Sequence, residues 1–87
     1  MIGKYLDICT SHLTQETVDD LAIGNIIGVF VNDYEEGIVI SVPDDTNIKV
    51  PKDLDTLFEY ARQNDITLIR LDRDGEESEE LPIYEWN

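Results

Sequence analysis

The chain has 87 residues, enough for one compact domain but too few for two, because domains usually run to roughly 50–200 residues. Apolar residues make up 41% of it and come in short, separated clusters, which indicates a folded globule and excludes a disordered acidic tail. Its 20 Asp and Glu against 6 Lys and Arg give a formal net charge of −14, which disfavours direct binding to nucleic acids or anionic membranes.

The first half predicts a strand, a short helix and a hairpin. Alternating apolar residues in KYLDICT favour a strand over residues 4–10, with Leu6 and Ile8 on one face. The next helix is expected to have Thr14 as its N-cap and Gly24 just past its end. IIGVFVND and GIVISVP then predict two strands joined by a tight acidic turn, forming an antiparallel hairpin.

The second half predicts a longer helix followed by one or two strands. PKDLDTLFEYARQND has Pro51 at a suitable first helical position and apolar residues at helical spacing. Those apolar residues are Leu54, Leu57, Phe58 and Ala61. ITLIRLD, residues 66–72, predicts a fourth strand, and LPIYEW, residues 81–86, an optional fifth strand at the sheet edge.

Taken together, these elements predict an α+β fold in which two helices cover one face of an antiparallel sheet of four to five strands. A ferredoxin-like arrangement is one form of this order, and another strand order with both helices on the same face is the alternative. We expect a single domain over residues 1–87, with an acidic loop at about 72–80 and an extended segment over 81–86.

The start of the chain and its cysteine content point to a cytoplasmic protein. MIGKYLDICT lacks the basic region, apolar run and cleavage site of a secretory signal, and no stretch reaches the ~18 apolar residues of a membrane span. The lone Cys9 cannot form an intramolecular disulfide, so no oxidising compartment is implied.

Two constellations invite a catalytic or metal-binding interpretation. Cys9 and His12 could act as nucleophile and base, but Cys9 falls late in an apolar strand and no third residue is placed to orient His12. DRDGEE, from Asp72, resembles the start of a calcium loop, yet Glu77 and Ile83 stand where an EF-hand requires glycine and glutamate. We therefore expect neither enzymatic activity nor a cofactor or metal. A small enzyme or a weak divalent-cation binder stays as the third hypothesis, after the two binding functions given below.

Acidic residues near turns are the strongest remaining signal. Alternate side chains of an extended chain lie roughly 6.6 Å apart, close to the spacing of successive phosphates along a nucleic-acid strand. A folded scaffold could therefore present carboxylates in place of phosphates. The candidates are Asp33, Glu35 and Glu36 at the hairpin tip, Asp44 and Asp45 in the next turn, and Asp72, Asp74, Glu76, Glu77, Glu79 and Glu80 near the end.

Apolar residues that follow the acidic loop are expected to hold it against the domain. Leu81, Ile83 and Trp86 would pack on the core, so that the loop is displayed and tethered at the same time. Tyr84 and Trp86 are also candidate partner contacts, because aromatic residues beside charge are frequent interaction hot spots.

Three stretches carry a resemblance to a known family. YLDICTSHLTQETVD, ISVPDD and IRLDRDG…LPIYEW resemble small acidic bacterial proteins of unknown function. Members of that family look like single domains carried by plasmids, phages and other mobile elements, and the family implies no activity and no catalytic residues. The setting resembles that of anti-restriction and anti-CRISPR inhibitors, several of which are acidic mimics of DNA.

These observations lead to two functional hypotheses. The first is a non-enzymatic inhibitor, monomeric or homodimeric, that occupies the nucleic-acid-binding surface of a partner protein or ribonucleoprotein. The second is an accessory interaction domain of a mobile element, acidic for solubility, that a partner recognises through the hairpin or the C-terminal aromatics. Carboxylates clustered on one face would favour the first, and an even spread the second.

Overall fold

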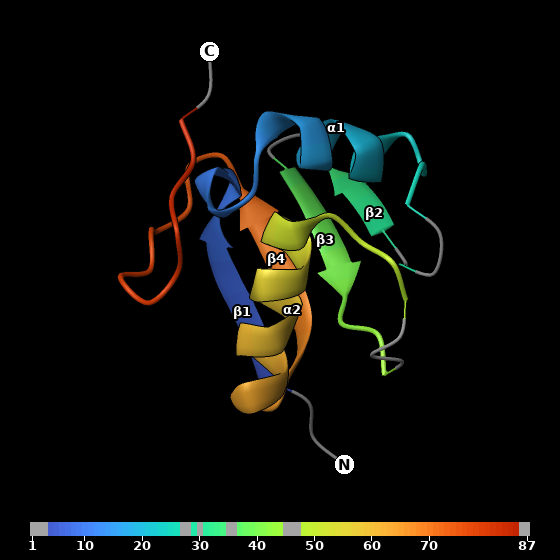
Figure 1. Cartoon of the computed structure of the whole chain (residues 1–87). Coiled ribbons are helices and arrows are strands. Elements are labelled where there is room, and N and C mark those ends of the chain that lie inside the picture. The colour runs from blue at the N-terminus through green and yellow to red at the C-terminus, as the bar shows by residue number, and fades with distance from the viewer. Residues whose placement is uncertain (1–3, 27–28, 30, 35–36, 45–47, 86–87) are drawn as a thin grey trace.

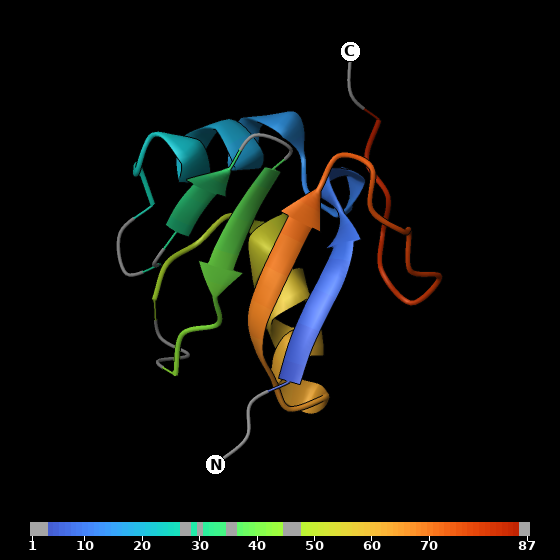
Figure 2. The same ribbon diagram turned by 180° about the vertical axis from the view of Figure 1, so that it is seen from behind.

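The computed structural model describes residues 4–26, 29, 31–34, 37–44 and 48–85. Both helices lie on one side of the sheet, in front of it in Figure 1 and behind it in Figure 2, so no described helix covers the opposite face. The elements in chain order are β1 (Lys4–Cys9), the 3-10 turn η1 (Thr10–His12), α1 (Gln15–Ala22), β2 (Val31–Tyr34), β3 (Gly37–Ser41), α2 (Lys52–Gln63) and β4 (Ile66–Asp72).

The sheet has the strand order β1-β4-β3-β2. β1 runs parallel to β4, whereas β3 is antiparallel to both β4 and β2. The expectation of a purely antiparallel sheet is therefore wrong, although the α+β class and the β2–β3 hairpin are confirmed. β1 and β4 are separated by most of the chain, far more than the dozen or so residues that a parallel connection requires. No short turn between them therefore determines whether they pair parallel or antiparallel.

Two predicted strand boundaries also differ from the structure. β2 begins at Val31 instead of residue 26, and Ile26 packs partly against the core from the loop after α1. The optional fifth strand does not form among the described residues 81–85, so β1 stays at the edge of the sheet. Residues 73–85 are called the C-terminal segment below; Figure 1 shows them, in orange and red, beside the end of β1.

The ends of α1 follow the sequence prediction. Thr14 is the N-cap, and its hydroxyl oxygen accepts a hydrogen bond of 3.2 Å from the Thr17 N–H. At the other end Gly24 adopts a φ of +73°, a conformation that favours glycine. The Asn25 N–H donates to the Asp20 carbonyl at 2.9 Å, which completes a Schellman motif and turns the chain away from the helix.

The hydrophobic core lies between the sheet and the two helices. Its members from α2 are the four apolar residues that helical spacing predicted, and Ile38, Ile40, Ile69 and Leu71 supply the facing side of the sheet. α2 begins one residue later than expected, with Pro51 as its N-cap. No helix of the described part of the chain is long and apolar enough to cross a bilayer.

Asp53 joins the N-termini of the two helices. It belongs to the first turn of α2 and is only 8% exposed. Its carboxylate accepts hydrogen bonds of 2.9 Å from the Thr14 N–H and of 2.9 Å from the Thr17 hydroxyl, both at the start of α1. A carboxylate there is stabilised by these donors and by the positive end of each helix dipole.

Candidate functional site: an acidic edge of the sheet

Parallel pairing of β1 with β4 gathers carboxylates at one edge of the helix-free face. In the register Asp7 lies opposite Arg70 and Cys9 opposite Asp72, so Asp7 and Asp72 approach each other across the two strands. A depression of about 420 Å³ lies at this edge. Asp7, Asp72, Asp74, Gly75 and Glu76 line it. We call its four carboxylates, those of Asp7, Asp72, Asp74 and Glu76, the acidic edge.

Arg70 and Tyr34 hold two of these carboxylates in place. The Arg70 guanidinium lies 3.3 Å from the Asp72 carboxylate and 3.8 Å from that of Asp7, and its Nε donates to the Tyr34 hydroxyl at 2.9 Å. The Tyr34 hydroxyl donates in turn to Asp72 at 3.3 Å. The bond to Tyr34 is the largest cause of a raised pKa for Arg70, and burial is the largest cause of a raised pKa for Tyr34. Arg70 thus stays charged, and it offsets part of the charge of the acidic edge.

Backbone hydrogen bonds attach the C-terminal segment to β1 and η1. The Cys9 N–H donates to the Glu76 carbonyl at 2.9 Å, and the Tyr84 N–H donates to the Ser11 carbonyl at 2.8 Å. Gly75 packs so closely on β1 that a Cβ there would lie 2.7 Å from the Ile8 carbonyl. This close approach carries the acidic loop past the end of the sheet and fixes Glu76 beside Asp7 and Asp72.

The segment's apolar anchor differs in part from the prediction. Leu81 is buried in the core as expected, whereas Ile83 is 54% exposed and does not hold the chain down. His12, buried beneath the segment, takes over that role. Its Nδ1 lies 2.8 Å from the Pro82 carbonyl, and its Nε2 accepts a hydrogen bond of 2.8 Å from the Ser78 N–H.

Of the predicted site residues, the structure brings together Asp72, Asp74 and Glu76. Glu77 does not line their depression, and its carboxylate instead accepts a hydrogen bond of 2.9 Å from the Ser11 hydroxyl. The segment is not one extended row, because turns occur at residues 73–74 and 79–80. Glu79 and Glu80 are exposed within the second turn, and Tyr84 is half-buried.

The other candidates do not join this group. Asp44 follows β3, whose last residue Ser41 pairs with Leu68, so it lies toward the opposite end of the sheet from Asp72. The backbone of Asp33 pairs with Ile38 in the hairpin, while its side chain lies outside the described part of the structure. The remaining candidates, Glu35, Glu36, Asp45 and Trp86, also lie outside the described residues.

Sequence reasoning missed Asp7, Tyr34 and Arg70 as members of the site. Alternation in KYLDICT does place Asp7 on the face opposite Leu6 and Ile8, but only the pairing with β4 brings it to Asp72. Acidity is also not confined to this edge. Four further exposed carboxylates lie on the helices, those of Glu16, Asp19, Asp55 and Glu59. Within the described residues no three His, Cys, Asp or Glu side chains are grouped so that they could hold a metal ion.

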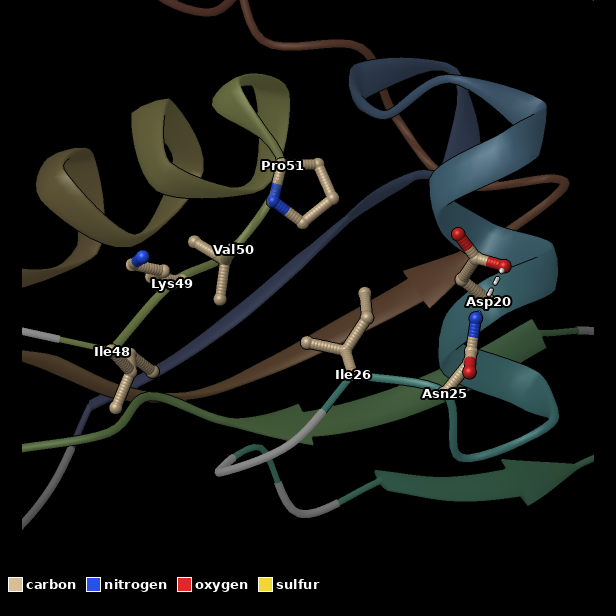
Figure 3. Close-up of a pocket in the computed structure, with 7 residues that line it drawn as sticks. All are labelled: Asp20, Asn25, Ile26, Ile48, Lys49, Val50 and Pro51. Atoms are coloured by element: carbon tan, nitrogen blue, oxygen red, sulfur yellow. Dashed lines mark hydrogen bonds between the residues drawn. The ribbon is translucent and has the colours of Figure 1, made fainter.

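A second hollow, of about 610 Å³, lies between the end of α1 and the connector to α2. Figure 3 shows Ile26 facing that connector, with the hydrogen-bonded side chains of Asp20 and Asn25 at the α1 end. The connector residues are Ile48, Lys49, Val50 and Pro51. The lining is therefore mainly apolar, with charged groups from Asp20 and Lys49.

Comparison with known protein families identifies the family of this chain. The model of the Family of unknown function (DUF5983) C-terminal domain matches residues 5–86. No curated protein and no solved structure matches the sequence. Because the family match spans nearly all of the chain, this protein belongs to the DUF5983 family and corresponds to its C-terminal domain.

Proposed function

We propose that the acidic edge and the C-terminal segment occupy the nucleic-acid-binding surface of a partner protein or ribonucleoprotein. The observation that carries this proposal is the shared depression, where carboxylates from β1, β4 and the C-terminal segment meet on a chain of net charge −14. A partner that holds phosphates with Lys and Arg side chains would be attracted to this edge and blocked by it.

Electrostatic attraction would make the binding of such a partner depend on salt concentration. Two carboxylates roughly 6 Å apart repel by about 1–3 kcal/mol at effective dielectric constants between water and a protein surface. Basic side chains of a partner would relieve that repulsion, so the free energy of binding gains a term that salt screens. Arg70 and Tyr34 hold Asp7 and Asp72 before binding, which reduces the conformational entropy lost in the complex.

The partner class follows from charge and from the resemblance to proteins of mobile elements. A host defence nuclease or its guide complex has the basic groove that the acidic edge would fill. We propose that the chain acts there as a non-enzymatic inhibitor of the anti-restriction or anti-CRISPR type, without binding nucleic acid itself. Its own charge disfavours contact with phosphates.

The test compares two variants with the same change in net charge. Glu76, Glu77, Glu79 and Glu80 are replaced together by Gln in the first, and the control carries Glu16→Gln, Asp19→Asn, Asp55→Asn and Glu59→Gln on the helices. A partner is captured from the native host, purified, and mixed with each variant in a stopped-flow instrument at low salt. We expect the first variant to associate at least tenfold more slowly and the control less than threefold more slowly.

Two outcomes would overturn this proposal. One is an equal loss of association rate in both variants, because the effect would then follow net charge and not the position of the carboxylates on the C-terminal segment. The other is a complex that persists unchanged in high salt and in excess duplex DNA, because a mimic must compete with the polyanion it replaces.

The pocket of Figure 3 favours a second candidate, an interaction domain that receives an apolar side chain of its partner. Ile48 and Val50 would surround such a side chain, and Asp20 would meet a basic neighbour on the same partner chain. Ile48→Asp would then abolish capture while the fourfold Gln variant would leave it intact. The opposite pattern would exclude this candidate.

A further inference from the structure

His12, the chain's one histidine, is held by two backbone groups of the C-terminal segment. It is 2% exposed, and no side-chain hydroxyl or carboxylate intervenes in either bond. The Pro82 carbonyl can only accept, and the Ser78 N–H can only donate. The ring must therefore carry its proton on Nδ1 and leave Nε2 as an acceptor, which is a neutral imidazole.

Few other contacts hold this part of the segment. Leu81 lies between the two residues that His12 binds and is buried in the core, while Glu79, Glu80, Pro82 and Ile83 are exposed. The neighbouring attachments are the bond from the Ser11 hydroxyl to the Glu77 carboxylate and the backbone bonds of Cys9 to Glu76 and of Tyr84 to Ser11. The imidazole thus bridges the middle of the segment to η1.

We infer that His12 is a pH-sensitive latch whose protonation releases the C-terminal segment from η1 while the sheet stays folded. An imidazolium carries an N–H on both ring nitrogens. Its Nε2–H would point at the Ser78 N–H, so a hydrogen bond is replaced by two opposed donors in a buried site. The segment can relieve this by moving into water, because most of its side chains are already exposed.

Other titratable groups lie on each element that contacts the latch. Glu77 and Glu79 flank Ser78 on the segment. Asp53 of α2 binds the backbone of Thr14, which is two residues after His12 in the sequence. Further titratable groups on the contacting elements are Glu80 and Tyr84 on the segment and Cys9 at the end of β1.

Amide hydrogen exchange by NMR on the wild-type chain at pH 7.5 and 5.5 tests the latch, with rates corrected for the intrinsic effect of pH. We expect the protection of the Ser78 and Tyr84 amides to fall at least tenfold at the lower pH. The amides of Ile69 and Leu71 in β4 report on the sheet and should keep their protection. The ¹⁵N shifts of the His12 ring should show the Nδ1–H tautomer at pH 7.5 and the imidazolium when protection is lost.

His12→Gln separates titration from simple loss of packing. Its side-chain amide offers an NH₂ donor group and a carbonyl acceptor but does not titrate, so we expect Ser78 protection in this variant to be equal at the two pH values. The same fall in protection as in the wild type would overturn the latch. If the variant does not fold, the measurements on the wild type still test the latch. A protonated His12 ring with unchanged Ser78 protection would contradict the inference, and so would an Nε2–H tautomer at pH 7.5.

The latch does not depend on the proposed partner. It concerns only the placement of the segment on η1, so the exchange experiment needs the chain alone. Where both hold, acidification would weaken partner binding by moving the part of the segment around Ser78, with Glu79 and Glu80, away from η1. A failure of partner binding at every pH would leave the latch unaffected.

Discussion

The junction of the two helices and the acidic edge of the sheet use the same functional group in opposite ways. At the junction a single carboxylate, that of Asp53, is buried among hydrogen-bond donors and ties α1 to α2. At the edge several carboxylates line one open depression, with Arg70 as the one cation that contacts them in the described structure. The first arrangement stabilises the fold and the second destabilises it through repulsion.

This difference shows that net charge alone does not describe the surface of an acidic protein. Asp53 counts toward the charge of −14 but is unavailable to a partner, because its oxygens are turned inward to Thr14 and Thr17. Carboxylates at the edge keep much of their acceptor capacity for solvent or for a basic partner. A functional argument from acidity therefore has to separate the carboxylates that hold the fold from those that are displayed.

The largest expected effect on stability is that of Asp53→Ala. The substitution leaves the Thr14 N–H and the Thr17 hydroxyl without their acceptor in a buried site, so we expect the free energy of unfolding in urea to fall by about 3 kcal/mol. Asp55→Ala, an exposed change in the same turn of α2, is the matched control and should cost less than about 1 kcal/mol. Equal losses would remove the distinction between the two kinds of carboxylate.

An intermediate effect is expected from Gly75→Ala, which acts on the acidic edge. The added methyl group would lie 2.7 Å from the Ile8 carbonyl, so the segment must move off β1. We expect about 1 kcal/mol of lost stability and at least tenfold faster exchange of the Cys9 amide, whose acceptor is the Glu76 carbonyl. Ser78→Ala changes the same segment without placing an atom against β1 and should leave Cys9 protected. Unchanged exchange in Gly75→Ala would show that the edge does not depend on this close approach.

The smallest expected effect concerns Tyr34 and alkaline pH. Burial raises the pKa of its phenol, so the neutral form is favoured in the folded state, and the resulting stability is present below pH ~10 and lost as the pH rises beyond it. Tyr34→Phe removes this term and should cost about 1 kcal/mol or less at pH 7. Urea unfolding of the two proteins between pH 8 and 11 should therefore converge as the pH rises. A constant difference in the free energy of unfolding across this pH range would mean that ionisation of the Tyr34 phenol does not affect stability.

Local signals predicted the elements of the fold well. Thr14 and Gly24 gave the ends of α1, and the apolar alternation of ITLIRLD gave β4 with the bounds found in the structure. These features depend on capping and on periodicity, which a short window of sequence contains. The strand order depends instead on which strand fills the gap between β1 and β3, and that is decided by packing across the whole chain.

The candidate site was predicted only in part for the same reason. Asp72, Asp74 and Glu76 lie close together in the sequence, so their grouping could be predicted. Asp7 joins them only through the parallel pairing of β1 with β4, which no local sequence pattern indicates. His12 stood out as a candidate base, yet its place depends on the backbone of Ser78 and Pro82, far along the chain. No local pattern marks Asp53 as the link between the helices, because its hydrogen-bond donors belong to the other helix.

The place of β4 between β1 and β3 also bears on how a nascent chain acquires this structure. β1 precedes β4 by most of the described chain and pairs with no other described strand, so the four-stranded sheet cannot be completed before β4 has emerged from the ribosome. Until then only the β2–β3 hairpin and the helices can form, and the unpaired first strand is open to chaperones and to misassembly with other chains.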